Sequence, residues 1–241
     1  MTFPIAPGVA GRFGERVAGG AVFEPMDIPL FPLRTVLFPG GALQLRIFEV
    51  RYLDMIGRCQ RDGSAFGVVS LTSGSEVQRP AAPGAEGPAF APESFHSVGT
   101  LAVIDALDRP QPGLMNIRCT GTHRFRVESR RRLEHGLWMG VARQLPDDPE
   151  VALPDDLVPL RGALRRIVDG FREQRNPPHR EMPIPEPHRW DDCGWLANRW
   201  CDILPMSGEQ KQRLMELESP LVRLELVGDL LERMRPSDPE P

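Results

Sequence analysis

Chemistry that needs a lysine is confined to one position, because Lys211 is the single lysine among the 29 Lys and Arg residues of the chain. A phosphate-binding P-loop places its lysine between Gly and Ser or Thr, so that the amine reaches the phosphates and the hydroxyl holds Mg²⁺. Here the neighbours are Gln210 and Gln212, which excludes a P-loop. A Ser–Lys dyad would have to use the same lysine, and the charged run around it offers no apolar pocket to activate the amine. We therefore predict no enzymatic activity and no catalytic residue.

Histidine and cysteine could together bind zinc near the middle of the second half of the chain. His179, His188, Cys193 and Cys201 fall in one stretch, but their spacing matches no familiar zinc pattern and His179 lies among prolines. The motifs G-x-S-x-G, G-x-G-x-x-G and H-E-x-x-H are also absent from the sequence. We predict no metal site and no cofactor.

Arginine forms the densest charged cluster of the sequence. Arg124 and Arg126 alternate with apolar residues, which predicts that both lie on one face of a strand. The cluster is either a patch for an anionic ligand or a solvated surface. The net charge of −4 weighs against a nucleic-acid partner, and so does the lack of an aromatic array on which bases could stack. The cluster consists of Arg124, Arg126, Arg130, Arg131 and Arg132.

Composition indicates a globular protein without membrane segments. The chain has 241 residues, 41% of them apolar, which is enough for one large or two small domains. No apolar stretch approaches the ~20 residues of a membrane helix. Residues 1–26 are glycine-rich, contain no apolar leader and are interpreted as a flexible tail. Four cysteines without a C-x-x-C pair then predict the reduced thiols of a cytoplasmic protein.

Residues 27–145 contain short apolar runs, several of them alternating as β-strands do. Leu43, Leu45 and Ile47 show the alternation most clearly. One helix interrupts the strands, since apolar residues recur at helical spacing from Tyr52 to Cys59. The expected strands are 27–33, 43–47, 65–71, 95–107, 114–119, 123–127 and 137–145, with a turn over 108–113.

From residue 157 the apolar period changes to that of helices. A stripe runs from Leu157 to Phe171, and a second helix is expected over 191–204. Ser207-Gly-Glu-Gln210 is a capping box, and Ser219-Pro220 pairs an N-cap with a first-turn proline. The change of period predicts an α+β protein, with a β-rich subdomain over 27–145 and a helical bundle over 146–241.

The most informative motifs lie near the start of the β-rich part. Ile28-Pro-Leu-Phe-Pro-Leu33 is an extended apolar run whose prolines predict an edge strand or the entry strand of a barrel. Phe38-Pro-Gly40 is a sharp turn, and Phe48-Glu-Val-Arg-Tyr52 leads from a strand into the helix. These motifs, with Val98-Gly-Thr100, Gly121-Thr-His-Arg-Phe125 and Leu204-Pro-Met-Ser207, resemble the substrate-binding N-terminal domain of Lon proteases over about residues 27–234.

The resemblance implies a PUA-like β pseudo-barrel followed by a helical bundle. It also implies binding of unfolded or extended polypeptides, in partnership with a protease or chaperone. Without the ATPase and peptidase motifs, we expect a stand-alone, non-catalytic adaptor. PUA-like barrels include RNA binders, so an RNA-binding module is the alternative. Either a peptide-binding surface or the barrel core is expected at Phe31, Leu33, Val36, Leu37 and Phe38, beside an edge where a peptide strand could pair.

Overall fold

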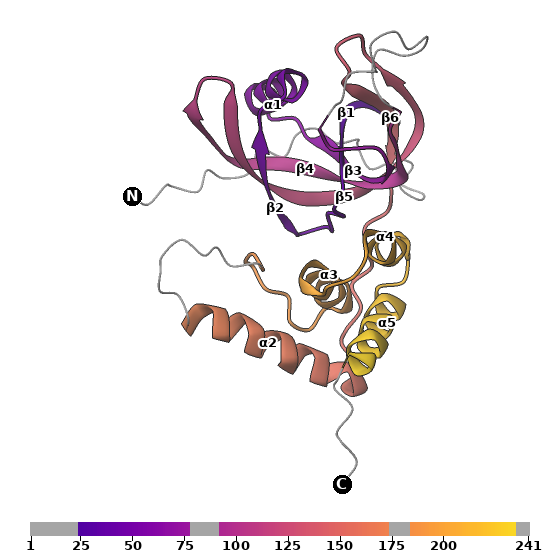
Figure 1. Cartoon of the computed structure of the whole chain (residues 1–241). Helices are drawn as coiled ribbons and strands as arrows, with labels where there is room; N and C mark the ends of the chain where they lie inside the picture. The colour runs from indigo at the N-terminus through magenta and orange to yellow at the C-terminus, as the bar shows by residue number, and fades with distance from the viewer. Residues whose placement is uncertain (1–23, 78–91, 174–183, 235–241) are drawn as a thin grey trace.

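The structure, a computed structural model, describes residues 24–77, 92–173 and 184–234. Strands precede Gln144 and helices follow it, with one helix inserted between the second and third strands (Figure 1). The predicted α+β class is confirmed. In chain order the elements are β1 (Met26–Leu33), β2 (Ala42–Ile47), α1 (Val50–Asp62), β3 (Phe66–Ser73), β4 (Ser94–Gln111), β5 (Leu114–Arg132), β6 (Trp138–Gln144), a short 3-10 helix (Asp155–Leu157), α2 (Val158–Glu173), α3 (Cys193–Ile203), α4 (Gly208–Glu216) and α5 (Pro220–Arg233).

All six strands form one sheet in the order β2-β5-β4-β3-β1-β6, and β5 also pairs with β6. The strands β5, β4, β3, β1 and β6 therefore close into a ring of pairings. Alternation along β1 separates two layers of core. Leu30 packs inside a cluster with Phe125, whereas Phe31 packs in a second cluster with residues of α1.

Of the two alternatives for β1, the edge strand is wrong, because β3 and β6 both pair with it. The two neighbours cover different lengths of the strand. β6 pairs with residues 26–30 and β3 with residues 30–33. Pro29 and Pro32 therefore each lie where β1 has a neighbour on one side only, so a missing N–H need not break a ladder.

Two further expectations about the strands are corrected. Residues 114–119 and 123–127 belong to one continuous strand, β5, which passes through Gly121. A Cβ at Gly121 would lie 2.5 Å from the carbonyl oxygen of Phe38. Glycine is therefore required because the backbone of the Phe38 turn comes close to β5, and not because the strand is interrupted there. The expected turn over 108–113 is shorter, since β4 continues to Gln111 and Gly113 turns with φ 77°.

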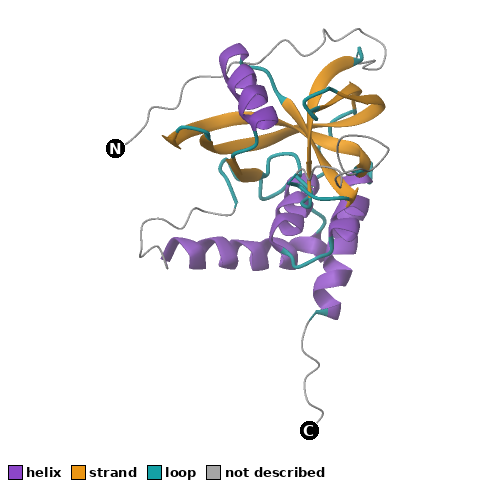
Figure 2. Ribbon diagram, turned by 45° about the horizontal axis from the view of Figure 1, so that its top comes forward, coloured by secondary structure: helices purple, strands orange, loops and turns teal. Residues whose placement is uncertain are grey.

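The helices lie close to the predicted ranges, with α3 at Cys193–Ile203 against the expected 191–204. Gly63 ends α1 in the left-handed conformation, with φ 63°. The capping box at Ser207 is present, and Ser219 caps α5. Helices α3, α4 and α5 lie on the side of the sheet away from α1 (Figure 2).

One apolar core joins the strands to the helices. Phe38 and Val98 from the β-rich part pack with Leu196, Trp200 and Leu224 of the helical part. Because both parts contribute to this core, the division into subdomains 27–145 and 146–241 stays a prediction. Residues 1–23 of the expected tail lie outside the described part of the chain. No helix in the described ranges has the length and apolar character needed to cross a bilayer.

Candidate binding surface

The five apolar residues considered for a peptide-binding surface lie in the core. Their exposed fractions run from 0% to 8%, so none of them presents a surface to a partner. Phe31 shows the reason, because its ring stacks on Tyr52 of α1 with centroids 3.9 Å apart. This burial matches the core interpretation and requires a binding surface to be built from other residues. The five are Phe31, Leu33, Val36, Leu37 and Phe38.

Arg124 does not belong to a surface patch. It is buried, and its guanidinium donates hydrogen bonds to the carbonyl oxygens of Met215 and Leu217, at 3.0 and 2.8 Å, and to Asp148 at 3.0 Å. Burial lowers the pKa of this arginine, and the Asp148 carboxylate opposes that shift. Arg124 therefore anchors the strands to the end of α4 and its following turn.

The remaining arginines of the cluster lie along β5 and mostly engage other parts of the protein. Arg130 lies over the ring of Phe95 at 4.5 Å, Arg131 pairs with Asp27 at 2.5 Å and Arg132 pairs with Glu93 at 3.5 Å. Arg126 is exposed beside a small hollow that Arg124 also lines. The predicted anionic-ligand patch thus has one buried member and three held by neighbouring side chains.

The histidines and cysteines considered for zinc do not come together. Cys193 and Cys201 are buried in the helical core, while His179 lies outside the described residues. Within the described part of the chain, no group of three His, Cys, Asp or Glu side chains is placed to hold a metal. Lys211 lies in α4, where its amine is 3.4 Å from the carbonyl oxygen of Asp202.

Exposed apolar side chains gather instead at the start of α1. Val50 is 72% exposed and Phe48 is 54% exposed, the two highest values among the large apolar residues that the structure describes. Isolated exposed apolar residues are common, but neighbouring ones beside a hollow mark interaction sites. Val50 forms part of such a hollow.

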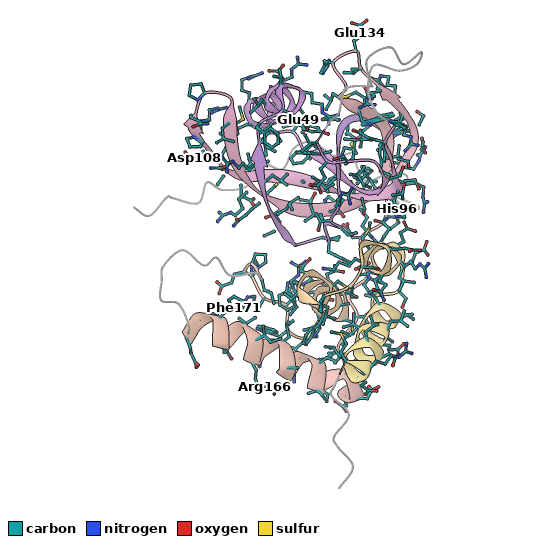
Figure 3. The ribbon with its side chains drawn as sticks, viewed as in Figure 1. Glu49, His96, Asp108, Glu134, Arg166 and Phe171 are labelled. Atoms are coloured by element: carbon teal, nitrogen blue, oxygen red, sulfur yellow. The ribbon has the colours of Figure 1, made fainter. Side chains whose placement is uncertain are left out.

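This hollow, the α1 groove, lies between α1 and the β5–β6 hairpin and has a volume of about 490 Å³. Its floor is apolar and buried, with Met55, Cys59 and Leu137. Its walls are partly exposed, with Val50, Leu133 and Met139. Glu134, at the turn of the hairpin, lies at the same end of the molecule as α1 (Figure 3). Charged side chains border the groove at Asp54, Arg58 and Arg131, and His135 adds an imidazole.

Arg51 holds the two sides of the groove together. The side chain is 2% exposed and donates a hydrogen bond of 2.9 Å from Nη1 to the carbonyl oxygen of Gly136 in the hairpin turn. Its guanidinium also lies 4.4 Å from the ring of Tyr52 and 3.3 Å from Glu49. Burial raises the pKa of Tyr52 well above its ordinary value, so this phenol stays neutral. The groove is therefore a fixed feature with a few adaptable side chains along it.

The sequence contains part of this site. Val50 stands inside the motif Phe48-Glu-Val-Arg-Tyr52 but outside the buried stripe that begins at Tyr52, which was the available signal of its exposure. Leu133 and Met139 carry no such signal. They reach the groove only because β5 and β6 pair, a relationship that periodicity does not give.

Comparisons with known proteins agree with the fold. The model of the ATP-dependent protease La (LON) substrate-binding domain matches residues 27–233. The Lon protease of Anaeromyxobacter dehalogenans is 26% identical over 236 residues, covering 94% of this chain but only 25% of that protein. A Lon N-terminal domain protein from Xanthomonas campestris is 29% identical, with a TM-score of 0.63 over 87% of this chain and 99% of its own. The N-terminal domain of Mycobacterium avium complex Lon protease shares the fold at 14% identity, with a TM-score of 0.53 over 87% of this chain and 100% of its own.

Proposed function

The chain belongs to the family of LON substrate-binding domains, and from this premise we propose that it binds extended, apolar segments of other polypeptides in the α1 groove without chemical change. The observation that carries the proposal is the exposed apolar wall at Val50 beside a buried apolar floor. Transfer of an apolar side chain of the bound polypeptide, the client, into such a groove removes apolar surface from water on both partners.

The side chains of the groove suit clients of varied sequence. Met55 and Met139 are unbranched and polarizable, so they can adjust to differently shaped apolar residues. Charged groups at the rim leave the ends of the bound segment in a polar environment. A surface of this kind selects for exposed apolar residues and not for one sequence, as expected for recognition of unfolded chains.

No catalytic step forms part of the proposal. The role is that of a substrate-recognition or adaptor protein, with a protease or chaperone as the partner that receives the client. We expect the affinity to be about micromolar, since a short apolar segment must offset the entropy lost when it is ordered.

The test uses a fluorescently labelled, unfolded model polypeptide, such as reduced and carboxymethylated lactalbumin, titrated with the full chain. Val50→Asp introduces a charge into the groove wall at the first position of α1, where an acidic residue also favours the helix. We expect the substitution to weaken binding about five- to tenfold, the effect of about 1 kcal/mol or slightly more of lost apolar contact.

Val222→Asp is the matched control. Val222 is 42% exposed and lies in the first turn of α5, outside the groove. This variant is expected to bind as the parent does. Equal affinities of all three proteins, with folding verified by circular dichroism, would show that the groove is not the client site.

A further inference from the structure

Strand β2 presents an edge of the sheet to the surroundings. It pairs with β5 over six residues, from Ala42↔Thr120 to Ile47↔Met115, without a register shift. Within residues 24–77, 92–173 and 184–234, no other strand pairs with it. A regular edge of this length is a ready template for an added strand.

The outward backbone groups of this edge follow from the pairing at its start. Gly121 donates its N–H to the carbonyl oxygen of Gly41 at 2.9 Å, so the carbonyl group of Gly41 faces β5 and the following N–H, that of Ala42, is directed away from it. Antiparallel strands alternate residues that face the partner with residues that face away. The N–H and C=O of Ala42 and Arg46 are therefore directed toward the outer edge.

The opposite edge of this part of the sheet is less suited to pairing. It is formed by the second half of β4, which extends beyond the residues paired with β3. This half leads past Asp108 to the tip of the β4–β5 hairpin (Figure 3). The β4–β5 ladder shifts register between Ile104 and Ala106 and again after Asp108, and Pro110 follows. Bulges, charges and proline protect a sheet edge against added strands, whereas β2 has no bulge and no proline.

The two faces of β2 specify different side chains on an added strand. Leu43 and Leu45 are half-buried against the cluster beneath α1, so their outer sides are left for further apolar contact. Arg46 and Arg118 are exposed on the opposite face, one on the edge strand and one on its neighbour. Arg46 and Arg118 line a shallow hollow together with Asp105 and Asp108, but these two carboxylates belong to β4, two strands from the edge.

We propose that the outer edge of β2 takes an extended segment of the client polypeptide as an additional strand, with apolar residues alternating with acidic ones. The proposal rests on the polypeptide-binding function and specifies its substrate class. Apolar side chains of the client cover Leu43 and Leu45, and its carboxylates face Arg46 and Arg118. The edge leads directly to the α1 groove, because Phe48 and Val50 follow β2 in the chain.

A client peptide explains the edge better than a second copy of this chain. Pairing two β2 strands would bring Arg46 and Arg118 of both copies to one face, where like charges repel. An acidic strand instead gains from the same two arginines. Backbone hydrogen bonds supply sequence-independent affinity, and the alternating side chains supply selection.

The experiment compares acetylated ten-residue peptides that alternate valine with glutamate or valine with lysine, by fluorescence anisotropy with the full chain. We expect the glutamate peptide to bind at least tenfold tighter at low salt, and the difference to shrink at high salt. N-methylation of all valines, or of all glutamates, removes N–H groups from one edge of the peptide at a time. The affinity of one of the two methylated peptides should fall at least tenfold, and that of the other less than twofold.

Two variants locate the contact on the protein. Arg46→Ala and Arg46→Pro both lack the charge, but only the proline variant lacks the outward N–H, so it should bind at least fivefold more weakly than the alanine variant. Equal effects of the two methylated peptides overturn the edge assignment, and so does a concentration-dependent dimer that Arg46→Pro abolishes. If Val50→Asp weakens client binding while Arg46→Pro matches Arg46→Ala, the edge proposal fails and the polypeptide-binding function stands.

Discussion

Nη2 of Arg199 lies 2.8 Å from the carbonyl oxygen of Pro39, across 160 positions of the chain. The same guanidinium donates to the carbonyl oxygen of Gly40 and pairs with Asp202 at 3.1 Å. The Phe38-Pro-Gly40 turn therefore does more than reverse the chain, since the carbonyl oxygens of Pro39 and Gly40 accept hydrogen bonds from Arg199 of α3. This contact connects the β-rich part to the helical part at a point where Arg199 is fully buried.

Replacement of Arg199 by alanine should destabilise the protein strongly. The substitution leaves the Asp202 carboxylate and two part-buried carbonyl groups without their cation, and removing one partner of a buried ion pair costs about 3–5 kcal/mol. Urea unfolding followed by circular dichroism measures the loss. Arg213→Ala is the matched control, because that side chain is 77% exposed and pairs only within α4, and it should change the free energy of unfolding by less than about 0.5 kcal/mol. Equal losses for the two variants would contradict the role assigned to Arg199.

Gly121 should not tolerate a side chain. A Cβ there would lie 2.5 Å from the carbonyl oxygen of Phe38 and 3.0 Å from Cγ of Leu37, so the turn would have to move. We expect Gly121→Ala to cost about 1–3 kcal/mol, as overpacked cores do, and to lower the melting temperature in a thermal scan. Gly170→Ala is the control, since nothing lies within 4 Å of its Cβ and alanine favours the helix by roughly 0.5–1 kcal/mol. A Gly121→Ala protein as stable as the parent would show that the turn adjusts freely.

The sequence predicts elements better than it predicts their neighbours. The alternation of Leu43, Leu45 and Ile47 and the capping box at Ser207 are local signals, and the structure contains both elements. The edge position of β1 was predicted wrongly because proline restricts hydrogen bonding at one position and says nothing about how many strands flank the rest. Which strands pair is decided by contacts between distant residues.

The candidate site was the least predictable part. Phe31 and Phe38 are large and apolar, and composition alone does not say whether such residues face a partner or the core. Arg124 looked like a surface charge because its strand alternates, yet the end of helix α4 covers this side chain. Val50 was within a recognisable motif, but the groove beside it exists only once the β5–β6 hairpin lies against α1.

Asp202 should make stability depend on pH. Burial raises the pKa of this carboxyl from its ordinary 3.8 to about 6, with Arg199 and Lys211 opposing the shift. The folded state therefore binds this proton more tightly than the unfolded state. The stabilisation is fully present below about pH 4 and is lost as the pH rises toward about 6, above which it changes no further. The free energy of unfolding of the parent, relative to Asp202→Asn, should fall between about pH 4 and 6 in urea titrations. A difference that is constant over this range would contradict the raised pKa.

Single-stranded RNA should bind weakly, because few of the clustered arginines are available to phosphates. Arg124 is buried at the junction with the helices, and Arg131 is held by Asp27. Each phosphate neutralised on a single strand contributes a slope of about −0.7 to the dependence of log K on log salt, so the few contacts left should give a shallow slope.

The measurement is a titration with labelled polyuridine at about 50 and 200 mM salt, conditions between which many-contact complexes weaken by orders of magnitude. We expect a change of less than about tenfold, and Arg126→Glu to reduce the residual binding without affecting the unfolded polypeptide. Tight binding with a slope steeper than about −3, lost in Arg126→Glu, would instead assign this surface to nucleic acid, provided the same protein shows no affinity for the polypeptide.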